Sequence, residues 1–185
     1  MDVASTTARS TRGFTLIELI TTLAVAAVSL AVLVPGWAAF TERSQVAATA
    51  NHLLTQLRYA RNEAVNRGRM VSLCPSDDAG SCSGDPFGWQ RGYLVFEDLD
   101  GDRDRDPGDT LLQVQGPLPT GMRLHSTAGR PAIRFRPDGA AWSTNTTFSL
   151  CLGDDPSTYR AVVLLGTGRA RVDRRAPGNR PVSCT

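Results

Sequence analysis

The residues best suited to chemistry near the end of the chain are Arg169 and Arg171, which follow Gly168 and are separated by one residue. Side chains two positions apart on a β-strand point to the same face, so we expect both guanidinium groups on one surface. Guanidinium groups form paired hydrogen bonds with phosphate, which suits contact with a DNA backbone whatever its base sequence. Four further arginines are expected to widen this basic patch: Arg160, Arg174, Arg175 and Arg180.

The charge of the chain is unevenly distributed. Its 20 basic residues are all arginine and are nearly balanced by 18 acidic residues, so the net charge of +2 does not by itself indicate nucleic-acid binding. Residues 156–185, however, hold six arginines and one acidic residue. A solvated edge strand, on which charges discourage aggregation, is the alternative interpretation of these arginines. No series of aromatic side chains accompanies them, which favours phosphate contact over reading of bases.

An acidic stretch lies earlier in the chain, where residues 77–109 hold ten acidic residues and three arginines. Carboxylates at alternate positions can supply the oxygen ligands of a calcium loop. Counted from Asp98, the series matches positions 1, 3, 5, 9 and 12 of an EF-hand, but Arg103 stands where that loop needs Gly and position 12 is Asp rather than Glu. We expect no cofactor and regard calcium as the alternative to a structural hairpin loop. The calcium candidates are Asp98, Asp100, Asp102, Asp106 and Asp109.

The four cysteines contain no C-x-x-C pair, so a zinc site is not expected. In an oxidising compartment they allow three disulfide pairings, and spacing alone does not choose among them. The pairing that we expect joins Cys74 to Cys82, closing a short loop, and Cys151 to Cys184. The second bond would fix the arginine-rich end of the chain to a sheet.

Signatures of catalysis are missing from the sequence. It contains no G-x-S-x-G motif, no phosphate-binding loop and no dinucleotide fingerprint. His52 and His125 are the two histidines, and no metal-ligating residue lies at ligand spacing from His52. We therefore do not expect an enzyme.

The N-terminal part of the chain has the length and polarity of a membrane helix. Residues 19–41 carry no formal charge, and as a helix they would span roughly 34 Å, against about 30 Å for a bilayer core. A secretory signal peptide fits poorly, because its apolar part is usually about 7–15 residues long and no small-x-small cleavage site follows. Arg9 and Arg12 precede the run and are expected on the cytoplasmic side. We expect a transmembrane helix over residues 14–40.

Two further elements are expected to hold the arginines and acidic residues in place. Apolar residues at three- and four-residue spacing predict an amphipathic helix over residues 41–68, ending at Gly68. From residue 69 to residue 185, short apolar runs separated by Pro and Gly predict an antiparallel β domain. This order of elements predicts an α+β fold, with a long N-terminal helix packed on antiparallel sheets. The expected strands span residues 70–74, 92–97, 110–115, 122–125, 132–136, 147–152, 160–165 and 169–173.

The segment GFTLIEL at residues 13–19 resembles the class III leader of type IV pilins and pseudopilins. In that family a prepilin peptidase cuts after the glycine, here Gly13, and methylates the next residue, here Phe14. The family's glutamate, fifth in the mature chain, corresponds to Glu18, and its helix-kinking proline corresponds to Pro35. The resemblance implies a cleaved leader over residues 1–13 and assembly with other pilins or pseudopilins through the N-terminal helix.

Two of these family residues also have a physical interpretation. A carboxylate buried in an apolar helix assembly needs a positive or hydrogen-bonding partner, and the free amine of a cleaved Phe14 would supply one to Glu18. Pro35 lacks a backbone N–H, so it is expected to kink or locally melt the helix. A helix end at the membrane surface, with Trp37 as an interfacial anchor, is the alternative at Pro35.

The β region resembles one branch of this family, the GspH/FimT minor pilins and pseudopilins, through the segments WQRGYLVFEDLDGDRDRDPGDTLL, FRPDGAAW and VVLLGTGRARV. FimT-like minor pilins are associated with DNA uptake in natural transformation through a Gly-Arg-x-Arg motif, which here is Gly168-Arg169-Ala170-Arg171. The resemblance implies a FimT-like minor pilin of a type IV pilus that binds double-stranded DNA. The alternative is a GspH-like pseudopilin, a structural component of the type II secretion system.

The expected location follows from the same features. The chain would cross the inner membrane once, with its C-terminal domain in the periplasm, and would enter a pilus or pseudopilus after assembly. A third alternative is a membrane-anchored periplasmic domain unrelated to filaments. It leaves Glu18 without a use, because a simple anchor does not need that carboxylate.

Overall fold

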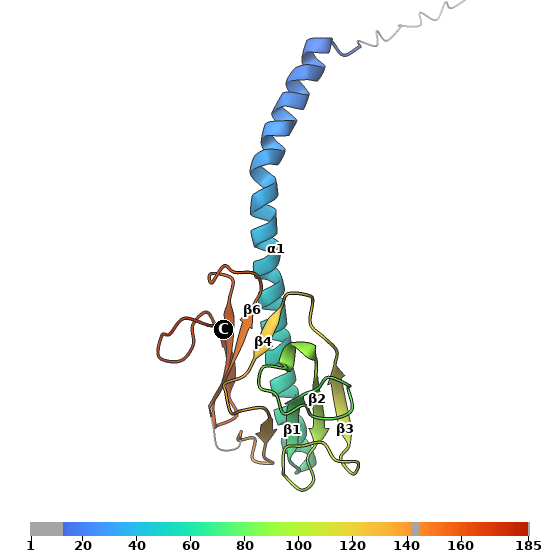
Figure 1. Cartoon of the computed structure of the whole chain (residues 1–185), viewed down its shortest axis with the longest axis vertical. Coiled ribbons are helices and arrows are strands. Elements are labelled where there is room, and N and C mark those ends of the chain that lie inside the picture. Colours follow the sequence, from blue (N-terminus) through green and yellow to red (C-terminus); the bar gives the residue numbers. More distant parts are fainter. Residues whose placement is uncertain (1–12, 142–144, 185) are drawn as a thin grey trace, which may run out of the picture. The chain divides into compact units, whose positions relative to one another are not determined.

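The computed structural model describes residues 13–141 and 145–184, without the side chains of residues 32–36 and 38–39. One long helix, α1, is followed by the eight strands that the sequence predicts, with ends that differ by at most one residue (Figure 1). The chain divides into two compact units, Met1–Phe40 and Thr41–Thr185. The elements are α1 (Leu16–Arg67), β1 (Val71–Pro75), the 3-10 helix η1 (Trp89–Arg91), β2 (Tyr93–Glu97), β3 (Leu111–Gln115), β4 (Arg123–His125), β5 (Ile133–Phe135), β6 (Thr146–Cys151), β7 (Arg160–Leu164) and β8 (Ala170–Asp173).

The first unit holds the apolar start of α1. Its helix is unbroken through Pro35, so the end or melting of the helix that the sequence suggested at this residue is not seen. The side chain of Pro35 lies outside the described residues, as do residues 1–12 of the predicted leader. Within the described part of the chain, no helix combines the length and the apolar character needed to cross a membrane. The transmembrane helix over residues 14–40 stays a prediction.

The second half of α1 is amphipathic, as predicted. Every residue of the predicted apolar stripe is at most 1% exposed. Gly68 follows the helix with φ +63°, and the N–H of Arg69 donates to the carbonyl of Ala64 at 3.3 Å, which is the expected glycine cap. The stripe consists of Val46, Ala50, Leu53, Leu57, Ala60 and Ala64.

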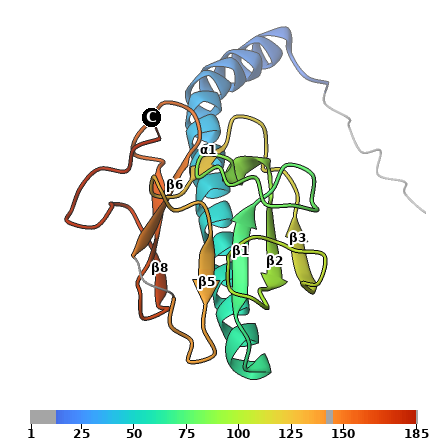
Figure 2. The same ribbon diagram turned by 60° about the horizontal axis from the view of Figure 1, so that its bottom comes forward.

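Two antiparallel sheets of four strands pack against this stripe. Their strand orders are β3-β2-β1-β5 and β4-β6-β7-β8, and Figure 2 shows them side by side along α1. A single core joins the stripe to the inner faces of both sheets. Trp89 lies in this core with its ring edge-on to that of Phe148 at 4.9 Å, and its indole N–H donates to the hydroxyl of Ser126 at 3.2 Å. The α+β fold predicted from the sequence is confirmed.

The outer face of each sheet is covered by a segment that a disulfide holds in place. Both predicted disulfides form, with Cα atoms 5.5 Å apart in Cys74–Cys82 and 6.2 Å apart in Cys151–Cys184. The first lies against Leu94 and Phe96 on the outer face of the β1–β2 sheet. The second lies in a small apolar cluster with Ala161, Val163 and Val182 on the outer face of the other sheet. The end of the chain is thereby fixed to a sheet.

Replacing Leu53 by Ala should lower the free energy of unfolding by about 2–5 kcal/mol, because it leaves a cavity between α1 and the sheets. The matched control is Val65→Ala on the same helix, where the side chain is 49% exposed. The control should change the free energy of unfolding by no more than about 0.5 kcal/mol. Urea unfolding followed by circular dichroism measures both variants. Equal losses would contradict the placement of the stripe in the core.

Candidate nucleic-acid interface

The predicted Gly-Arg-x-Arg motif runs from the tight turn between β7 and β8 into β8, with Gly168 in the turn and Arg171 on the strand. Gly168 has φ +80°, and its N–H donates to the carbonyl of Leu165 at 2.8 Å. A Cβ atom at this position would overlap the carbonyl oxygen of Gly139. Arg61 of α1 donates from Nε to that same oxygen at 2.9 Å. The glycine of the motif therefore has a structural role, because no other residue lets the hairpin approach the turn at Gly139 so closely.

Arg169 and Arg171 are both exposed, as the motif predicts. Arg171 lies opposite Val163 of β7, whose side chain belongs to the cluster on the outer face of the sheet. Its Nε lies 3.6 Å from a carboxylate oxygen of Asp173. For Arg169, no side-chain hydrogen bond or ion pair is found within the described residues. The motif therefore presents two guanidinium groups to solvent, one of them with a partial counterion.

Asp173 is the acidic residue within this basic segment. It accepts hydrogen bonds from the backbone N–H of Arg174 at 2.7 Å and of Arg175 at 3.4 Å. These two bonds, with the ion pair to Arg171, lower the pKa of Asp173. The carboxylate is therefore ionised at neutral pH, and it offsets one of the positive charges around it.

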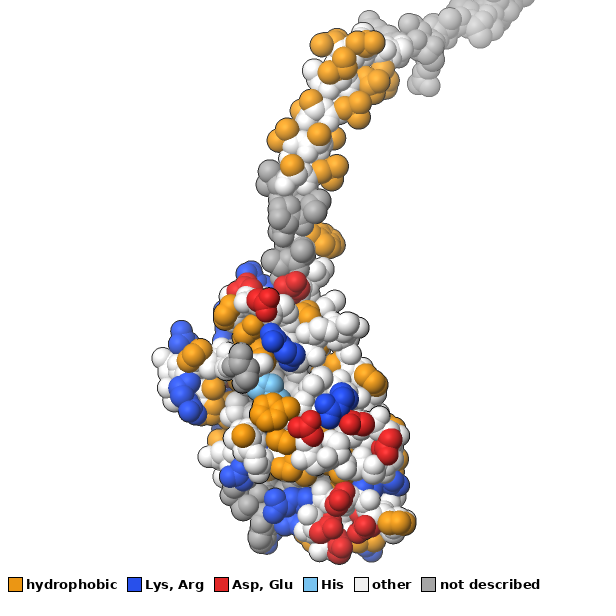
Figure 3. Space-filling model, viewed as in Figure 1, with side chains coloured by type: hydrophobic (Ala, Val, Ile, Leu, Met, Phe, Trp, Pro, Cys, Tyr) orange, Lys and Arg blue, Asp and Glu red, His pale blue; other side chains and the backbone are white. Residues whose placement is uncertain are grey.

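Residues 174–180 form a loop that projects from the β domain, which we name the arginine loop (Figure 1). A bridge closes it, because the N–H of Ala176 donates to the carbonyl of Arg180 at 2.9 Å. The exposed Arg175 and Arg180 each donate once to a carbonyl within the loop, to Asn179 at 3.2 Å and Pro177 at 3.0 Å. Figure 3 shows basic side chains on the projecting loop at the left edge of the domain and acidic side chains gathered at its lower end.

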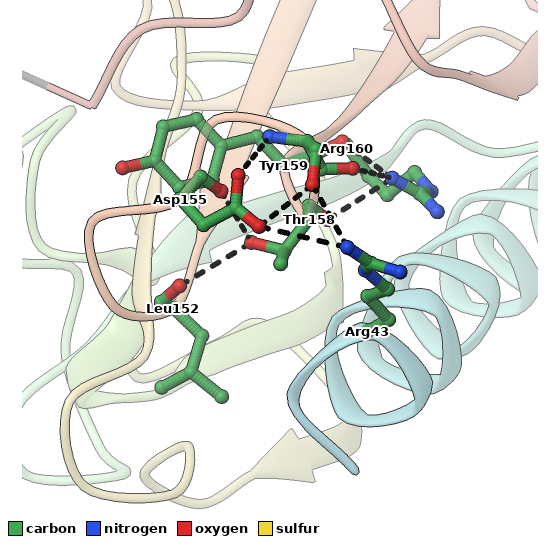
Figure 4. A network of polar contacts seen from close by, with 7 residues as sticks. Arg43, Leu152, Asp155, Thr158, Tyr159 and Arg160 are labelled. Atoms are coloured by element: carbon green, nitrogen blue, oxygen red, sulfur yellow. Dashed lines mark hydrogen bonds and ion pairs between the residues drawn. The ribbon is translucent and has the colours of Figure 1, made fainter. Parts of the chain in front are cut away.

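Arg160 lies apart from the Arg169–Arg171 pair, so the prediction that it widens their basic patch is wrong. It pairs in register with Leu150, so its side chain shares the inner face of the sheet with Leu150 and Val162. Its Nη1 donates to the carbonyl of Tyr159 at 2.7 Å and to that of Thr158 at 3.0 Å (Figure 4). The structure therefore places Arg160 and Arg171 on opposite faces of one sheet.

Arg43 of α1 completes the surroundings of Arg160 and was missed by the sequence reasoning. It contacts the turn that precedes β7, with Nη2 at 3.7 Å from a carboxylate oxygen of Asp155 (Figure 4). Burial, followed by the nearby charges of Arg174 and Arg43, lowers the pKa of Arg160. Arg43 and Arg160 thus form a second basic group, next to Arg174 of the arginine loop. No sequence signal indicated it, because Arg43 lies on a helix far from β7 in the sequence.

The acidic loop between β2 and β3 brings together only part of the predicted calcium set. Carboxylate oxygens of Asp98, Asp100 and Asp102 lie within 4.8 Å of one another. Asp98 is buried and already accepts hydrogen bonds from the Ser72 hydroxyl at 2.6 Å and the Gly101 N–H at 2.7 Å.

The remaining calcium candidates are Asp106 and Asp109, and Asp109 forms hydrogen bonds with the backbone of the same loop. Asp109 accepts from the backbone N–H groups of Leu99 and Asp106, at 3.1 and 3.0 Å. Burial and the neighbouring carboxylates raise the pKa of Asp106. These contacts give the carboxylates of the loop a structural role, and calcium binding stays the untested alternative to it.

The residues predicted for processing and assembly lie at the start of α1. The N–H of Glu18 donates to the Thr15 hydroxyl at 3.3 Å, so Thr15 caps the helix and Glu18 lies in its first turn. Gly13 and Phe14 precede the helix, and Phe14 is 84% exposed. The roles predicted for Gly13, Phe14, Glu18 and Pro35 stay predictions.

Comparison with known proteins identifies the family. Residues 49–168 match the family model described as type II transport protein GspH. The chain belongs to the GspH family. A second model, the prokaryotic N-terminal methylation motif, matches residues 8–34. A comparison with curated proteins finds no match.

Two solved structures share the fold of this GspH-family chain. The type IV minor pilin FimU of Pseudomonas aeruginosa is 22% identical, with a TM-score of 0.60, and the match covers 79% of this chain and 99% of FimU. The minor pseudopilin EpsH, from the type 2 secretion system of Vibrio cholerae, is 19% identical, with a TM-score of 0.50, and the match covers 72% of this chain and 98% of EpsH.

These comparisons confirm the predicted resemblance to the GspH/FimT branch and the pilin-like fold. The GspH-family chain is a minor pilin or pseudopilin of a type IV pilus or a type II secretion system. It is a structural component that assembles with other pilins and not an enzyme. Both kinds of filament remain open, because one neighbour is a pilin and the other a pseudopilin.

Replacing Gly168 by Ala should displace the β7–β8 hairpin and destabilise the domain, because a methyl group would collide with the Gly139 carbonyl. The matched control is Gly178→Ala in the arginine loop, where φ is +76° and nothing lies within 4 Å of an added Cβ. Its cost should be limited to the left-handed backbone, about 1–2 kcal/mol. Thermal unfolding should show a larger loss for Gly168→Ala. Equal losses would contradict the close approach of Gly168 to Gly139.

Proposed function

We propose that this GspH-family chain is a FimT-like minor pilin of a type IV pilus that binds double-stranded DNA for uptake in natural transformation. The observation that carries the proposal is the exposed pair of Arg169, directly before β8, and Arg171 within β8. Two guanidinium groups on one strand face can contact successive phosphates of a DNA backbone without reading bases. Duplex DNA is polyanionic, so such contacts give salt-sensitive binding.

The surroundings of this pair support the proposal. Arg174, Arg175 and Arg180 are exposed on the arginine loop that follows directly after β8. Between residues 156 and 185, the carboxylate of Asp173 opposes six arginines, so the region stays positive although Asp173 is ionised. Arginine is well suited to phosphate, because its planar fork offers paired donors and remains charged. Arg160 contributes less, because it lies on the other face of the sheet and donates to three carbonyls.

A second candidate function has equal support from the family. Residues 49–168 match a model described as type II transport protein GspH, and a structural neighbour is the minor pseudopilin EpsH. In this case the chain is a GspH-like pseudopilin, a structural component of the type II secretion system. The arginines would then be a solvated face of an edge strand that limits aggregation. DNA binding separates the two functions.

Processing and membrane insertion belong to both candidates. We propose that a prepilin peptidase removes residues 1–13 after Gly13 and methylates Phe14, and that residues 14–40 then cross the inner membrane once. The match of residues 8–34 to the methylation motif supports this. The exposed apolar side chains of α1, such as Leu16, Leu23 and Leu30, suit a lipid or helix environment. The β domain would lie in the periplasm, where both disulfides can form.

The full chain in detergent should bind a blunt DNA duplex with micromolar, salt-sensitive affinity. Changing Arg169 and Arg171 together to Gln should weaken binding and make the negative slope of log affinity against log salt less steep by about 2, since each lost phosphate contact reduces its magnitude by about 1. The control changes Arg58 and Arg69 to Gln, which removes the same charge from exposed sites on and just after α1. Fluorescence anisotropy over a salt series measures both. Absence of binding at low salt would favour the secretion function.

Mass spectrometry of the protein purified from bacterial membranes should find N-methylated Phe14 as its first residue. The reason is that Gly13 and Phe14 occupy the expected cleavage positions of a matched methylation motif. The same measurement on protein from a strain without the prepilin peptidase should find residues 1–13 retained. An unmethylated N-terminus at any other residue in the first strain would contradict the proposed processing.

A further inference from the structure

A groove of about 340 Å³ lies on the outer face of the β4-β6-β7-β8 sheet, beneath part of the C-terminal segment. His125 of β4 pairs with Ser149 of β6, and Ser149 pairs with Ala161 of the outer cluster, so these side chains share that face. The arginine loop contributes Pro177 and Arg180 to the lining. The groove therefore lies between a sheet surface and the loop that carries exposed arginines.

An aromatic pair forms one side of the groove. The ring centroids of Phe87 and His125 are 5.3 Å apart, and the Phe87 side chain is 49% exposed. The backbone holds Phe87 in place, because the N–H of Ser126 donates to the carbonyl of Pro86 at 2.9 Å and the N–H of Phe87 donates to Asp85 at 2.9 Å. Burial, with a smaller effect of Arg123, lowers the pKa of His125, so its ring is neutral at neutral pH.

The remaining lining is rich in hydroxyl groups and carries one positive charge. Arg180 uses Nε to bond Pro177, and its terminal nitrogens have no hydrogen-bond partner within the described residues. No described residue that lines the groove is acidic. The hydroxyl groups belong to Ser126, Thr127, Thr147, Ser149 and Ser183. The hydroxyls of Ser126 and Thr127 already bond the backbone of Arg130 and Thr147.

This set of groups matches the chemistry of a nucleotide. A base can stack on an exposed aromatic ring, the hydroxyl groups of Thr147 and Ser149 can bond its polar edge, and a guanidinium can hold the adjoining phosphate. The volume falls within the range of small-ligand sites. Base pairs inside a duplex cannot enter such a groove, because both of their faces are stacked and their edges are paired. A terminal pair exposes one face but is held to its partner strand, so an unpaired base is the occupant that fits the groove.

The groove also lies in line with the predicted DNA-binding arginines. Thr147 in its lining pairs with Val163, and Val163 pairs with Arg171, so these three side chains form one row across the outer face. Neighbouring strands lie about 4.8 Å apart, which puts Thr147 and Arg171 roughly 10 Å from each other. One DNA strand can therefore contact both regions. No sequence pattern indicated this groove, because Phe87 and His125 come from separate segments and only the fold brings them to the arginine loop.

We propose that this groove binds one unpaired nucleotide at a single-stranded end of DNA, with its base on Phe87 and its phosphate on Arg180. The proposal rests on the proposed DNA binding and adds a preference for strand ends. It predicts that a duplex with an unpaired thymine overhang binds more tightly than the same duplex with blunt ends. A stacked base is worth about 1–3 kcal/mol, so the gain should be at least about fivefold.

The test measures the ratio of the two affinities by fluorescence anisotropy, with the full chain in detergent at constant salt. Phe87→Leu should bring the ratio close to one, and Phe87→Tyr, which keeps an aromatic ring, should preserve it. The matched control is Leu99→Ala, another exposed apolar side chain, at 48% exposure, which should leave the ratio unchanged. Free thymidine monophosphate should compete only weakly, because it lacks the contacts of the adjoining duplex.

A second measurement uses the unaltered protein and so does not depend on the folding of a variant. Ultraviolet light should cross-link an overhang that carries 5-iodouracil to a peptide that contains Phe87 or His125. Cross-links confined to residues 165–175 would overturn the inference.

The outcomes separate this inference from the proposed function. If the blunt duplex binds and the ratio of overhang to blunt-duplex affinity is near one, nucleotide binding in the groove is overturned and the proposed function stands. Overhang binding that Phe87→Leu abolishes, without blunt-duplex binding, would support the groove and overturn duplex binding. Absence of binding by either DNA would overturn both.

Discussion

The fold depends on one constraint: a single face of α1 must fill the core between two small sheets. Neither four-stranded sheet covers its own inner face, and both close on the same six-residue stripe. Three of those six residues are alanine, at positions 50, 60 and 64, which lets the sheet side chains approach the helix closely. Trp89 completes the core because its large ring reaches Phe148 of the other sheet. Burial of this apolar surface supplies the main stabilisation of the domain.

The position of the candidate interface follows from that packing. Since the inner faces of both sheets are packed against α1, the sheets can meet a partner only through their outer faces, edges and hairpin turns. Arg61, on the same helix, donates to the carbonyl of Gly139, and Gly168 packs against that carbonyl. The helix thereby determines where the β7–β8 hairpin presents Arg169 and Arg171. The disulfide Cys151–Cys184 then holds the end of the chain over the outer face, which keeps the arginine loop near the same surface.

Much of the fold could be predicted from the sequence, because its periodicities are local. The stripe of α1, the cap at Gly68 and all eight strands follow from spacing and turn residues. Both disulfides match the one pairing, among three, that closes a short loop and fixes the end of the chain to a sheet. The face of the sheet on which the Arg160 side chain lies could not be predicted. It depends on the pairing of Arg160 with Leu150 and not on neighbouring residues in the sequence. The contact of Gly168 with Gly139 and the Phe87–His125 pair are likewise made only by the tertiary fold.

Exchange of backbone amide hydrogens, compared with and without a short blunt DNA duplex, tests the central claim most directly. That claim is that the outer arginine surface of the β7–β8 hairpin and the arginine loop contacts DNA. The predicted result is slower exchange at residues 165–180 and no change in the acidic loop at residues 98–109, whose carboxylates repel phosphate. Unchanged exchange at residues 165–180, under conditions where the duplex is bound, would contradict the claim.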